Sequence, residues 1–234
     1  MSLVETSWLD KNSNHIKIID CSWHMPQTQR SGFEEYKIKH IPNSIFFDLD
    51  ENSKKGTGLP HMLVELNDWE RIVSKMGIKN EDEIVIYDNS DVISSCRCWF
   101  NFIYFGHNPK LVHVLNGGLK KWIKENKEVT NDVSSIKTSD YKSFEKKELV
   151  KNKEEVDLNI EKQYFKVIDA RSKERFEGKI PEPRKGVRSG SIKNSFCIPF
   201  NLCLCEDKTF KNKKDLKLIF ETCLKNTNEK NIVF

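Results

Sequence analysis

The sequence lacks any long hydrophobic run. No apolar stretch among its 234 residues approaches the roughly 18–20 residues needed to span a bilayer. The first eleven residues contain Glu5 and Asp10 and have no basic stretch followed by an apolar one, so a secretory signal peptide is not expected. We therefore expect a protein without a membrane partner that is located in the cytoplasm.

The sequence also has little excess of either charge. Its 39 Lys and Arg against 35 Asp and Glu give a net charge of +4, and the lysines are spread along the chain. This distribution is typical of a solvated surface and argues against a nucleic acid partner. The seven cysteines are an odd number in a chain without an export signal, which indicates reduced thiols rather than a disulfide framework.

Bulky apolar residues are present in quantity. Fourteen Phe, five Trp and five Tyr can build real cores, which excludes wholesale disorder. The length suits one large or two smaller α/β domains.

The strongest organisational signal is an internal repeat. Three segments recur in the same order at offsets of 148 to 151 residues. The pairs are 16–20 with 165–169, 40–47 with 191–200, and 83–87 with 231–234. Similar segments in one order and at nearly one offset indicate two copies of a single α/β unit.

Within the first copy, apolar patterns predict alternating strands and helices. Residues 66–75 have helical spacing and end before Gly77, and 84–87 form a short β-branched run. A helix over 96–105, a strand over 111–115 and a short helix containing Trp122 follow. This alternation predicts an α/β fold with a mostly parallel sheet flanked by helices.

These patterns predict three parts. Residues 1–126 form the first domain. Residues 127–163, rich in Lys, Glu, Asn, Ser and Asp, form a linker and a polar entry segment. Residues 164–234 form a second domain that is incomplete, because the chain ends inside the strand that matches 84–87.

Short motifs in both copies carry a family resemblance. In the first copy they lie at 36–42, 46–50, 59–63, 87–88, 97–99, 105–107 and 114–122, and in the second at 169–171, 175–176, 181–184 and 198–200. In this combination and order the chain resembles the two-domain rhodanese family of sulfurtransferases, most closely its 3-mercaptopyruvate sulfurtransferase branch. The resemblance implies two tandem rhodanese-like α/β domains, of which the first is catalytically silent.

The resemblance also implies an activity. A nucleophilic cysteine in the second domain would take sulfane sulfur from 3-mercaptopyruvate, or from thiosulfate, as a persulfide and pass it to a thiol, cyanide or thioredoxin-like acceptor. Such a thiolate needs a loop of backbone N–H groups that leads into a helix. In the family the cysteine directly follows the strand equivalent to 84–87, a position that Asp88 holds in the first copy.

The repeat offset places the corresponding residue of the second copy at position 236, two beyond the last residue. We therefore expect a C-terminally truncated chain that is inactive as given and contains no catalytic residue. The cysteines at positions 96, 98, 197, 203, 205 and 223 do not fall where the nucleophile belongs and are interpreted as structural thiols. A zinc site from the last four is a weaker alternative, because C-x-C here lacks a second close pair or a nearby His. We expect no metal and no cofactor.

Arg175 and Arg184, nine residues apart in the second copy, match family positions that bind the substrate. A planar guanidinium can hold a carboxylate through two parallel hydrogen bonds, so two of them suit a 2-oxo acid. The alternative is that these are surface arginines that pair with Glu174, Glu177 or Glu182.

Asp50 and His61, eleven residues apart, match family residues that line the active-site cleft. An aspartate beside a histidine can orient the imidazole and tune its proton affinity. The alternative is a capping aspartate and a surface histidine.

A different class of function also fits the sequence. The product could be a catalytically inactive remnant, or a module that binds anions or oxo acids through Arg175 and Arg184 without turning them over.

Overall fold

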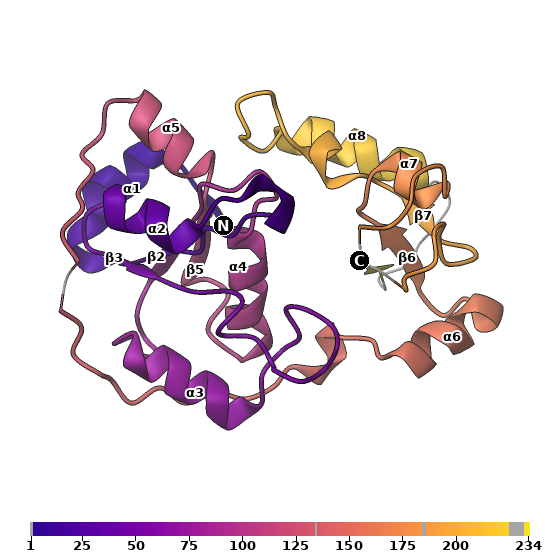
Figure 1. Cartoon of the computed structure of the whole chain (residues 1–234), viewed down its shortest axis with the longest axis horizontal. Helices are drawn as coiled ribbons and strands as arrows, with labels where there is room; N and C mark the ends of the chain where they lie inside the picture. The colour runs from indigo at the N-terminus through magenta and orange to yellow at the C-terminus, as the bar shows by residue number, and fades with distance from the viewer. Residues whose placement is uncertain (1, 134, 184–185, 225–231) are drawn as a thin grey trace. The chain divides into compact units, whose positions relative to one another are not determined.

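The computed structural model describes residues 2–133, 135–183, 186–224 and 232–234. The chain divides into two compact units, Met1–Lys147 and Glu148–Phe234, which are described separately. In Figure 1 the first runs from indigo to pink and the second from pink to yellow.

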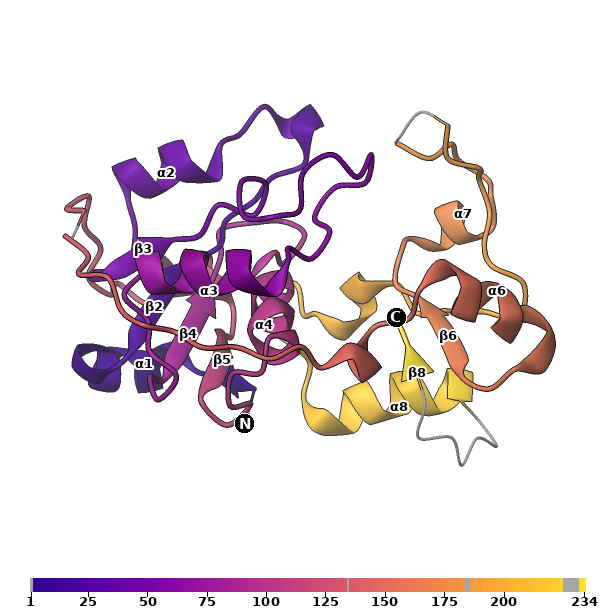
Figure 2. The same ribbon diagram turned by 90° about the horizontal axis from the view of Figure 1, so that it is seen from below.

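The first unit is built on a five-stranded sheet in which every pairing is parallel. Its order is β1-β5-β4-β2-β3, and Figure 2 shows β2, β4 and β5 side by side. The strands are β1 (Leu3–Val4), β2 (Lys17–Asp20), β3 (Ser44–Phe46), β4 (Ile84–Tyr87) and β5 (Val112–Leu115).

Helices cover both faces of this sheet. They are α1 (Thr6–Asn12), α2 (Gly32–Ile38), α3 (Leu66–Lys75), α4 (Ser95–Tyr104) and α5 (Gly118–Lys124). In Figure 1 α3 lies on one side of the strands and α1 and α5 on the other. The predicted α/β architecture is confirmed, and the helix predicted over 66–75 has those bounds.

The alternation of side chains along β4 explains why both faces are covered. Ile84 and Ile86 join the core that includes α3 and α4, whereas Val85 and Tyr87 join the core that includes α1 and α5. Successive side chains of a strand point to opposite faces, so a four-residue apolar strand requires a helix layer on each side.

One glycine is required where β5 turns into α5. Gly118 has φ +54, and a Cβ there would lie 2.3 Å from the carbonyl oxygen of Asp88. The N–H of Leu119 donates to that same carbonyl at 3.0 Å. A side chain at position 118 would therefore separate α5 from the end of β4.

Part of the segment predicted as a linker packs on the first unit. Tyr141 is buried, and its ring stacks on His107 at a centroid distance of 5.8 Å. Thr130 and His40 exchange backbone hydrogen bonds of 2.8 and 2.9 Å. The division between the units accordingly falls after Lys147 rather than after residue 126, because these contacts tie 127–147 to the first sheet.

The second unit has a three-stranded parallel sheet of order β7-β6-β8. Its strands are β6 (Lys166–Asp169), β7 (Phe196–Cys197) and β8 (Ile232–Val233), and its helices are α6 (Lys153–Lys162), α7 (Lys173–Phe176) and α8 (Lys213–Leu224). Short 3₁₀ turns elsewhere are Ser13–His15, Pro26–Thr28, Lys147–Leu149 and Phe200–Cys203. In both units the first long strand lies between the next two, since the order β4-β2-β3 has its counterpart in β8-β6-β7.

The two units differ in how much apolar surface they bury. Among the described residues, the second unit contributes four buried hydrophobic side chains, those of Phe165, Ile168, Ile198 and Leu204. Both large apolar cores consist of residues of the first unit. Burial of apolar area is the main stabilising contribution to folding, so the first unit is expected to be the more stable.

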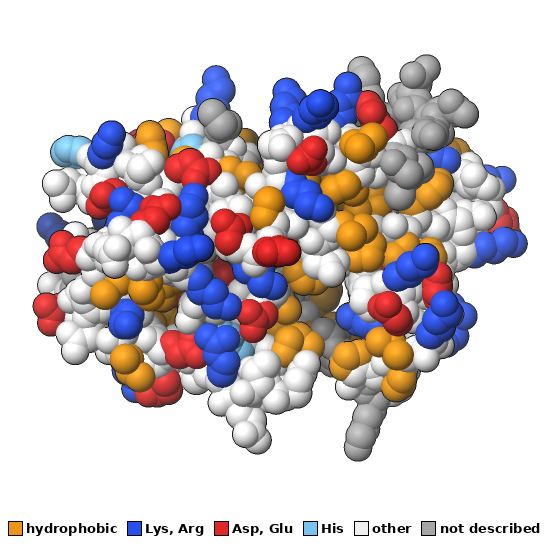
Figure 3. Space-filling view, turned by 90° about the horizontal axis from the view of Figure 1, so that it is seen from above, with side chains coloured by type: hydrophobic (Ala, Val, Ile, Leu, Met, Phe, Trp, Pro, Cys, Tyr) orange, Lys and Arg blue, Asp and Glu red, His pale blue; other side chains and the backbone are white. Residues whose placement is uncertain are grey.

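Within the described part of the chain, no helix combines the length and apolar character of a transmembrane span. Figure 3 shows basic and acidic side chains interspersed on one face of the molecule, in keeping with the net charge of +4.

Candidate functional site

Asp50 and His61, predicted as a pair, are in contact in the first unit. The Nε2 of His61 lies 2.8 Å from Oδ1 of Asp50. The other carboxylate oxygen of Asp50 accepts a hydrogen bond of 2.9 Å from the indole Nε1–H of Trp23. Trp23 also meets the His61 ring edge to face at 4.8 Å between centroids. Since Trp23 and Asp50 each contact the imidazole, its orientation is fixed from two sides.

Arg97 on α4 supports this pair from the backbone side. Its Nη2 donates to the carbonyl oxygen of His61. The backbone of His61 adopts a left-handed conformation, with a φ of +55°. A non-glycine residue adopts that conformation only where its surroundings hold it. Burial lowers the pKa of Arg97, and its Nε has no hydrogen-bond partner among the described residues. Arg97 therefore acts as an anchor for the His61 turn.

Replacing Arg97 by glutamine is expected to loosen the His61 turn and so expose the Trp23 indole N–H. A hydrogen bond from a charged donor contributes about 1.5–3 kcal/mol, so hydrogen exchange at Trp23 Nε1 should accelerate about tenfold or more. The measurement is exchange of the indole N–H by NMR, with the buried Trp69 as internal reference. Arg71→Gln, an exposed arginine on α3, is the matched control. Unchanged exchange in Arg97→Gln would argue against the anchor.

At the carboxyl end of β4, Asp88 occupies the position where the family resemblance places a cysteine in the second copy. Its Oδ1 accepts from the backbone N–H of Ser90 at 2.9 Å, and its Oδ2 from that of Ser95 at 2.8 Å. Burial raises the pKa of Asp88, although these hydrogen bonds oppose the shift. The Asp88 carboxylate thus satisfies the amide of Ser90 in the loop and that of Ser95, the first residue of α4.

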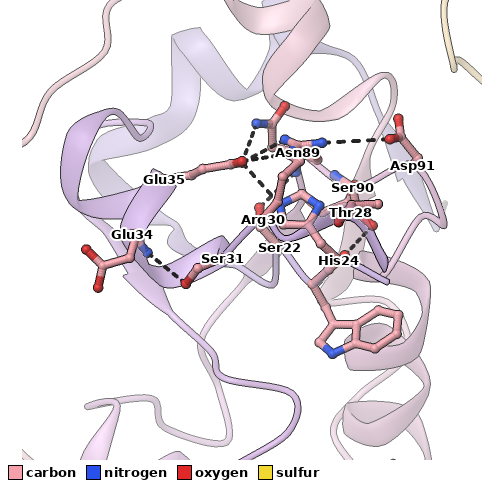
Figure 4. A network of polar contacts seen from close by, with 12 residues as sticks. Ser22, His24, Thr28, Arg30, Ser31, Glu34, Glu35, Asn89, Ser90 and Asp91 are labelled. Carbon is pink, nitrogen blue, oxygen red and sulfur yellow. Dashed lines mark hydrogen bonds and ion pairs between the residues drawn. The ribbon is translucent and has the colours of Figure 1, made fainter. Parts of the chain in front are cut away.

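A network of polar side chains fills the same edge of the first sheet (Figure 4). Figure 4 shows Arg30 and Asn89 reaching the Glu35 carboxylate, with bonds of 2.6 and 2.8 Å from Arg30 and 2.9 Å from Asn89. The Nε2 of His24 lies 3.1 Å from Glu35. Burial would raise the pKa of Glu35, but the bonds from Arg30 and Asn89 outweigh it and lower the pKa. This edge therefore holds a neutralised network rather than an open anion site.

In the second unit, Arg171 and Arg175 follow the carboxyl end of β6, just as the polar network of the first unit lies at one edge of its sheet. Arg171 donates from Nε to both carboxylate oxygens of Asp169, at 2.9 and 3.0 Å, and from Nη1 to Glu182 at 2.7 Å. Its Nη2 also donates to the carbonyl of Gly190 at 2.8 Å. Arg171 is thus fully engaged and fixes the loop of residues that follows β6.

Arg175, on the short helix α7, contacts Glu182, one of the three partners considered from the sequence. Its Nε and Nη2 donate to the two carboxylate oxygens at 3.2 and 2.5 Å, and the bond from Arg175 lowers the pKa of Glu182. The Nη1 of Arg175 has no hydrogen-bond partner among the described residues. The end of the guanidinium formed by Nη1 and Nη2 can therefore still take an anion. Arg184 lies outside the described residues.

Burial disfavours the thiolate form of three of the described cysteines, whereas Cys205 is exposed. Burial raises the pKa of Cys21 and of Cys203, and it raises that of Cys96 to about 12. Cys98 is buried, and Cys197 lies 3.9 Å from the carbonyl oxygen of Arg171. Among the described residues no cluster of His, Cys, Asp or Glu could hold a metal ion. The side chain of Cys223 lies outside the description, so the zinc alternative that includes it is not tested.

Two residues of the site were not singled out from the sequence for a role. Trp23 and Arg97 are separated from Asp50 and His61 by 27 and 36 positions, and only the fold brings them together. Glu182 was considered only as a surface partner, although its side chain is 5% exposed and bridges two arginines.

The site residues thus lie on two parallel α/β units, with an Asp–His pair in the first and arginines held by carboxylates in the second. A model of the rhodanese-like domain matches residues 5–125. The thiosulfate/3-mercaptopyruvate sulfurtransferases 1 (mitochondrial) and 2 of Arabidopsis thaliana are each 36% identical over 94% of this chain. The crystal structure of SseA from Escherichia coli, described as a 3-mercaptopyruvate sulfurtransferase of rhodanese fold, matches 99% of this chain and 87% of its own, with a TM-score of 0.88 and 25% identity.

The chain therefore belongs to the rhodanese family, as predicted from the sequence. It spans 63% of the first Arabidopsis relative and 70% of the second.

Proposed function

We propose that this protein acts in sulfur transfer from 3-mercaptopyruvate, with thiosulfate as the near alternative. In this proposal residues 1–234 supply the groups that hold the donor and line the cleft, and none of their seven cysteines carries the sulfur. The sulfane sulfur would pass, through a persulfide on a cysteine that is not one of these seven, to a thiol, cyanide or thioredoxin-like acceptor. The observation that carries the proposal is the Asp50–His61 contact of 2.8 Å, together with kinship to sulfurtransferases over 94% of the chain.

Arg175 and Arg184 are proposed to hold the donor's carboxylate and carbonyl oxygens. Arg175 supports this role because Glu182 orients one edge of its guanidinium, and no described residue hydrogen-bonds its Nη1. A pre-oriented planar cation loses little freedom on binding a carboxylate, which favours bidentate recognition. The negative charge of Glu182 would repel a second anion bound beside it. The contact of 2.7 Å between Arg171 and Glu182 offsets this charge, so that Arg175 can still attract the donor's carboxylate.

The proposal that no cysteine of this chain is the nucleophile rests on the thiol environments. A nucleophilic thiol needs a lowered pKa, from a helix N-terminus, a cation or a ring of amide donors. The described thiols with a resolved shift have raised pKa values. In the loop that follows β4, the backbone amide groups of Ser90 and Ser95 donate to the carboxylate of Asp88. We propose for that reason that residues 1–126 are the silent copy.

Substituting Arg175 by glutamine is expected to weaken binding of 3-mercaptopyruvate or pyruvate by about ten- to hundredfold. That range corresponds to the loss of a charged hydrogen-bond pair of about 1.5–3 kcal/mol. Isothermal titration calorimetry of the full chain measures it. Lys173→Gln removes the same charge two positions away, on an exposed side chain, and should leave affinity within about twofold. Equal loss in both variants would mean that only net charge matters, and no loss in either would remove Arg175 from the donor site.

An anion- or oxo-acid-binding module without turnover is the second candidate. This module would use the same donor site but would not transfer sulfur. A measured affinity for the donor therefore supports both candidate functions, and only an assay of sulfur transfer distinguishes between them. The cytoplasmic location predicted from the sequence can be checked by cell fractionation, since one plant relative is named as mitochondrial.

A further inference from the structure

Four charged side chains form a continuous series of contacts at the carboxyl end of β6. They are Asp169, Arg171, Glu182 and Arg175, and we refer to them as the β6 charge cluster. Asp169 accepts from Arg171 at 2.9 Å, and Arg171 donates to Glu182 at 2.7 Å. Glu182 in turn accepts from Arg175 at 2.5 Å. Two carboxylates therefore face two guanidinium groups, and the charges of the cluster sum to zero.

Both carboxylates of the cluster are held in their ionised form. The hydrogen bond from Arg175 lowers the pKa of Glu182. Burial raises the pKa of Asp169, but the hydrogen bonds from Arg171 outweigh it and lower the pKa. The side chain of Glu182 is 5% exposed, so solvent ions screen its charge only weakly. Glu182 is thus a fixed negative charge beside Arg175.

Glu182 and a bound donor would share one nitrogen of Arg175. Nη2 carries two hydrogens, of which one is used for Oε2 of Glu182, and no described residue hydrogen-bonds Nη1. A carboxylate bound at the edge formed by Nη1 and Nη2 would therefore place an oxygen about 5 Å from Glu182, the usual separation of two acceptors on one amino group. At that separation a unit charge changes the affinity for a singly charged ion by about tenfold.

The size of this effect depends on the charge of the donor. 3-Mercaptopyruvate carries a single negative charge at neutral pH, whereas thiosulfate carries two. Repulsion from Glu182 is proportional to the donor's charge, and the free energy of desolvating an ion grows with the square of its charge. Because Arg171 is itself paired with Asp169, the cluster has no net positive charge to offset this larger cost. A dianion is therefore disfavoured more strongly than a monoanion.

We propose that Glu182 is a specificity-determining residue that biases the donor site toward singly charged 2-oxo acids and against doubly charged donors such as thiosulfate. The inference rests on the proposed role of Arg175 in holding the donor and specifies the charge of the preferred donor. Glu182 contacts Arg175 rather than the reacting atoms, so it acts on donor selection and takes no part in the transfer of sulfur.

The probes that test this role are oxamate and oxalate, planar anions of nearly the same shape that carry one and two negative charges at neutral pH. Each is titrated into the full chain by isothermal titration calorimetry at one fixed ionic strength, because salt screens electrostatic interactions. We expect the parent chain to bind oxamate more tightly. Glu182→Gln keeps an acceptor oxygen for Arg175 and removes the charge, so the ratio of oxalate affinity to oxamate affinity should rise about tenfold.

Two further variants separate the charge of Glu182 from its other effects. Glu182→Asp keeps the charge on a shorter side chain, so both affinities should fall while their ratio stays within about twofold of the parent ratio. Glu174→Gln removes an exposed carboxylate next to Arg175 in the sequence and should also leave the ratio within about twofold. Thiosulfate, titrated in the same way, should follow oxalate.

Failure of this inference can be told apart from failure of the donor site. An unchanged ratio in Glu182→Gln, an equal rise in Glu174→Gln, or loss of both anions in Glu182→Gln would overturn the specificity role. The donor site itself would stand in those cases if Arg175→Gln still weakens binding of oxamate. If the parent chain bound neither anion up to about 10 mM, the donor site and the inference would both be overturned.

Discussion

Replacing Trp69 by alanine is expected to lower the free energy of unfolding of the first unit by about 3–5 kcal/mol, the usual cost of removing a buried large aromatic side chain. Trp69 is fully buried, stacks on Phe105 at 4.8 Å and meets Phe102 edge to face at 5.1 Å. Its ring therefore joins α3 to α4 over one face of the sheet, and truncation leaves a cavity that these aromatic neighbours cannot fill.

Amide hydrogen exchange of β4 measures this change, because its four residues are buried in the centre of the sheet and report opening of the first unit alone. Val133→Ala, an exposed position of the same unit, should change stability by no more than about 0.5 kcal/mol. A loss below about 1 kcal/mol for Trp69→Ala would show that the aromatic cluster is not the core of this unit.

Asp20→Asn is expected to stabilise the first unit at neutral pH by about 2–3 kcal/mol. Burial raises the pKa of Asp20 from 3.8 to about 6, with hydrogen bonds from Ser22 opposing the shift and the charge of Asp88 adding to it. The folded state thus holds a proton more tightly than the unfolded chain. The stabilisation that this bound proton gives the first unit is fully present below about pH 4 and is lost as the pH rises through about 6.

The asparagine variant keeps the oxygen that accepts the 2.9 Å hydrogen bond from Ser22 and removes the ionisation. Exchange-derived stability at several pH values between 4 and 8 should therefore fall with pH in the parent chain more steeply than in Asp20→Asn. Asp68→Asn, at an exposed site on α3, is the control and should follow the parent. Parallel curves for the parent chain and Asp20→Asn would contradict the burial of an ionisable Asp20.

The sequence predicted the fold well where one segment's own pattern decides its structure. The apolar spacing of 66–75 gives α3 with those bounds, and the run at 84–87 gives β4. The match of Asp50 and His61 to motifs of the resembling family also led to their pairing, and the two side chains are in contact. In each case the signal lies within a dozen residues, where periodicity and family motifs are readable.

Contacts between distant segments were not predictable in the same way. Trp23 and Arg97 reach the Asp50–His61 pair from other elements, and nothing in their spacing indicates it. The polar composition of 127–147 suggested a linker, but Tyr141 inserts beside His107 and ties this stretch to the first unit. A single aromatic anchor outweighs the average polarity of a segment, since one buried ring contributes several kcal/mol.

The central proposal is that this chain binds the sulfur donor and that none of its seven cysteines accepts the sulfur. The most direct test is intact-protein mass spectrometry of the full chain after incubation with 3-mercaptopyruvate, with pyruvate release followed in the same sample and a thiol then added. The account predicts donor binding, no gain in mass of one sulfur atom, and pyruvate at background. A cyanide-labile gain of one sulfur atom, abolished by substituting any one of the seven cysteines, would contradict it.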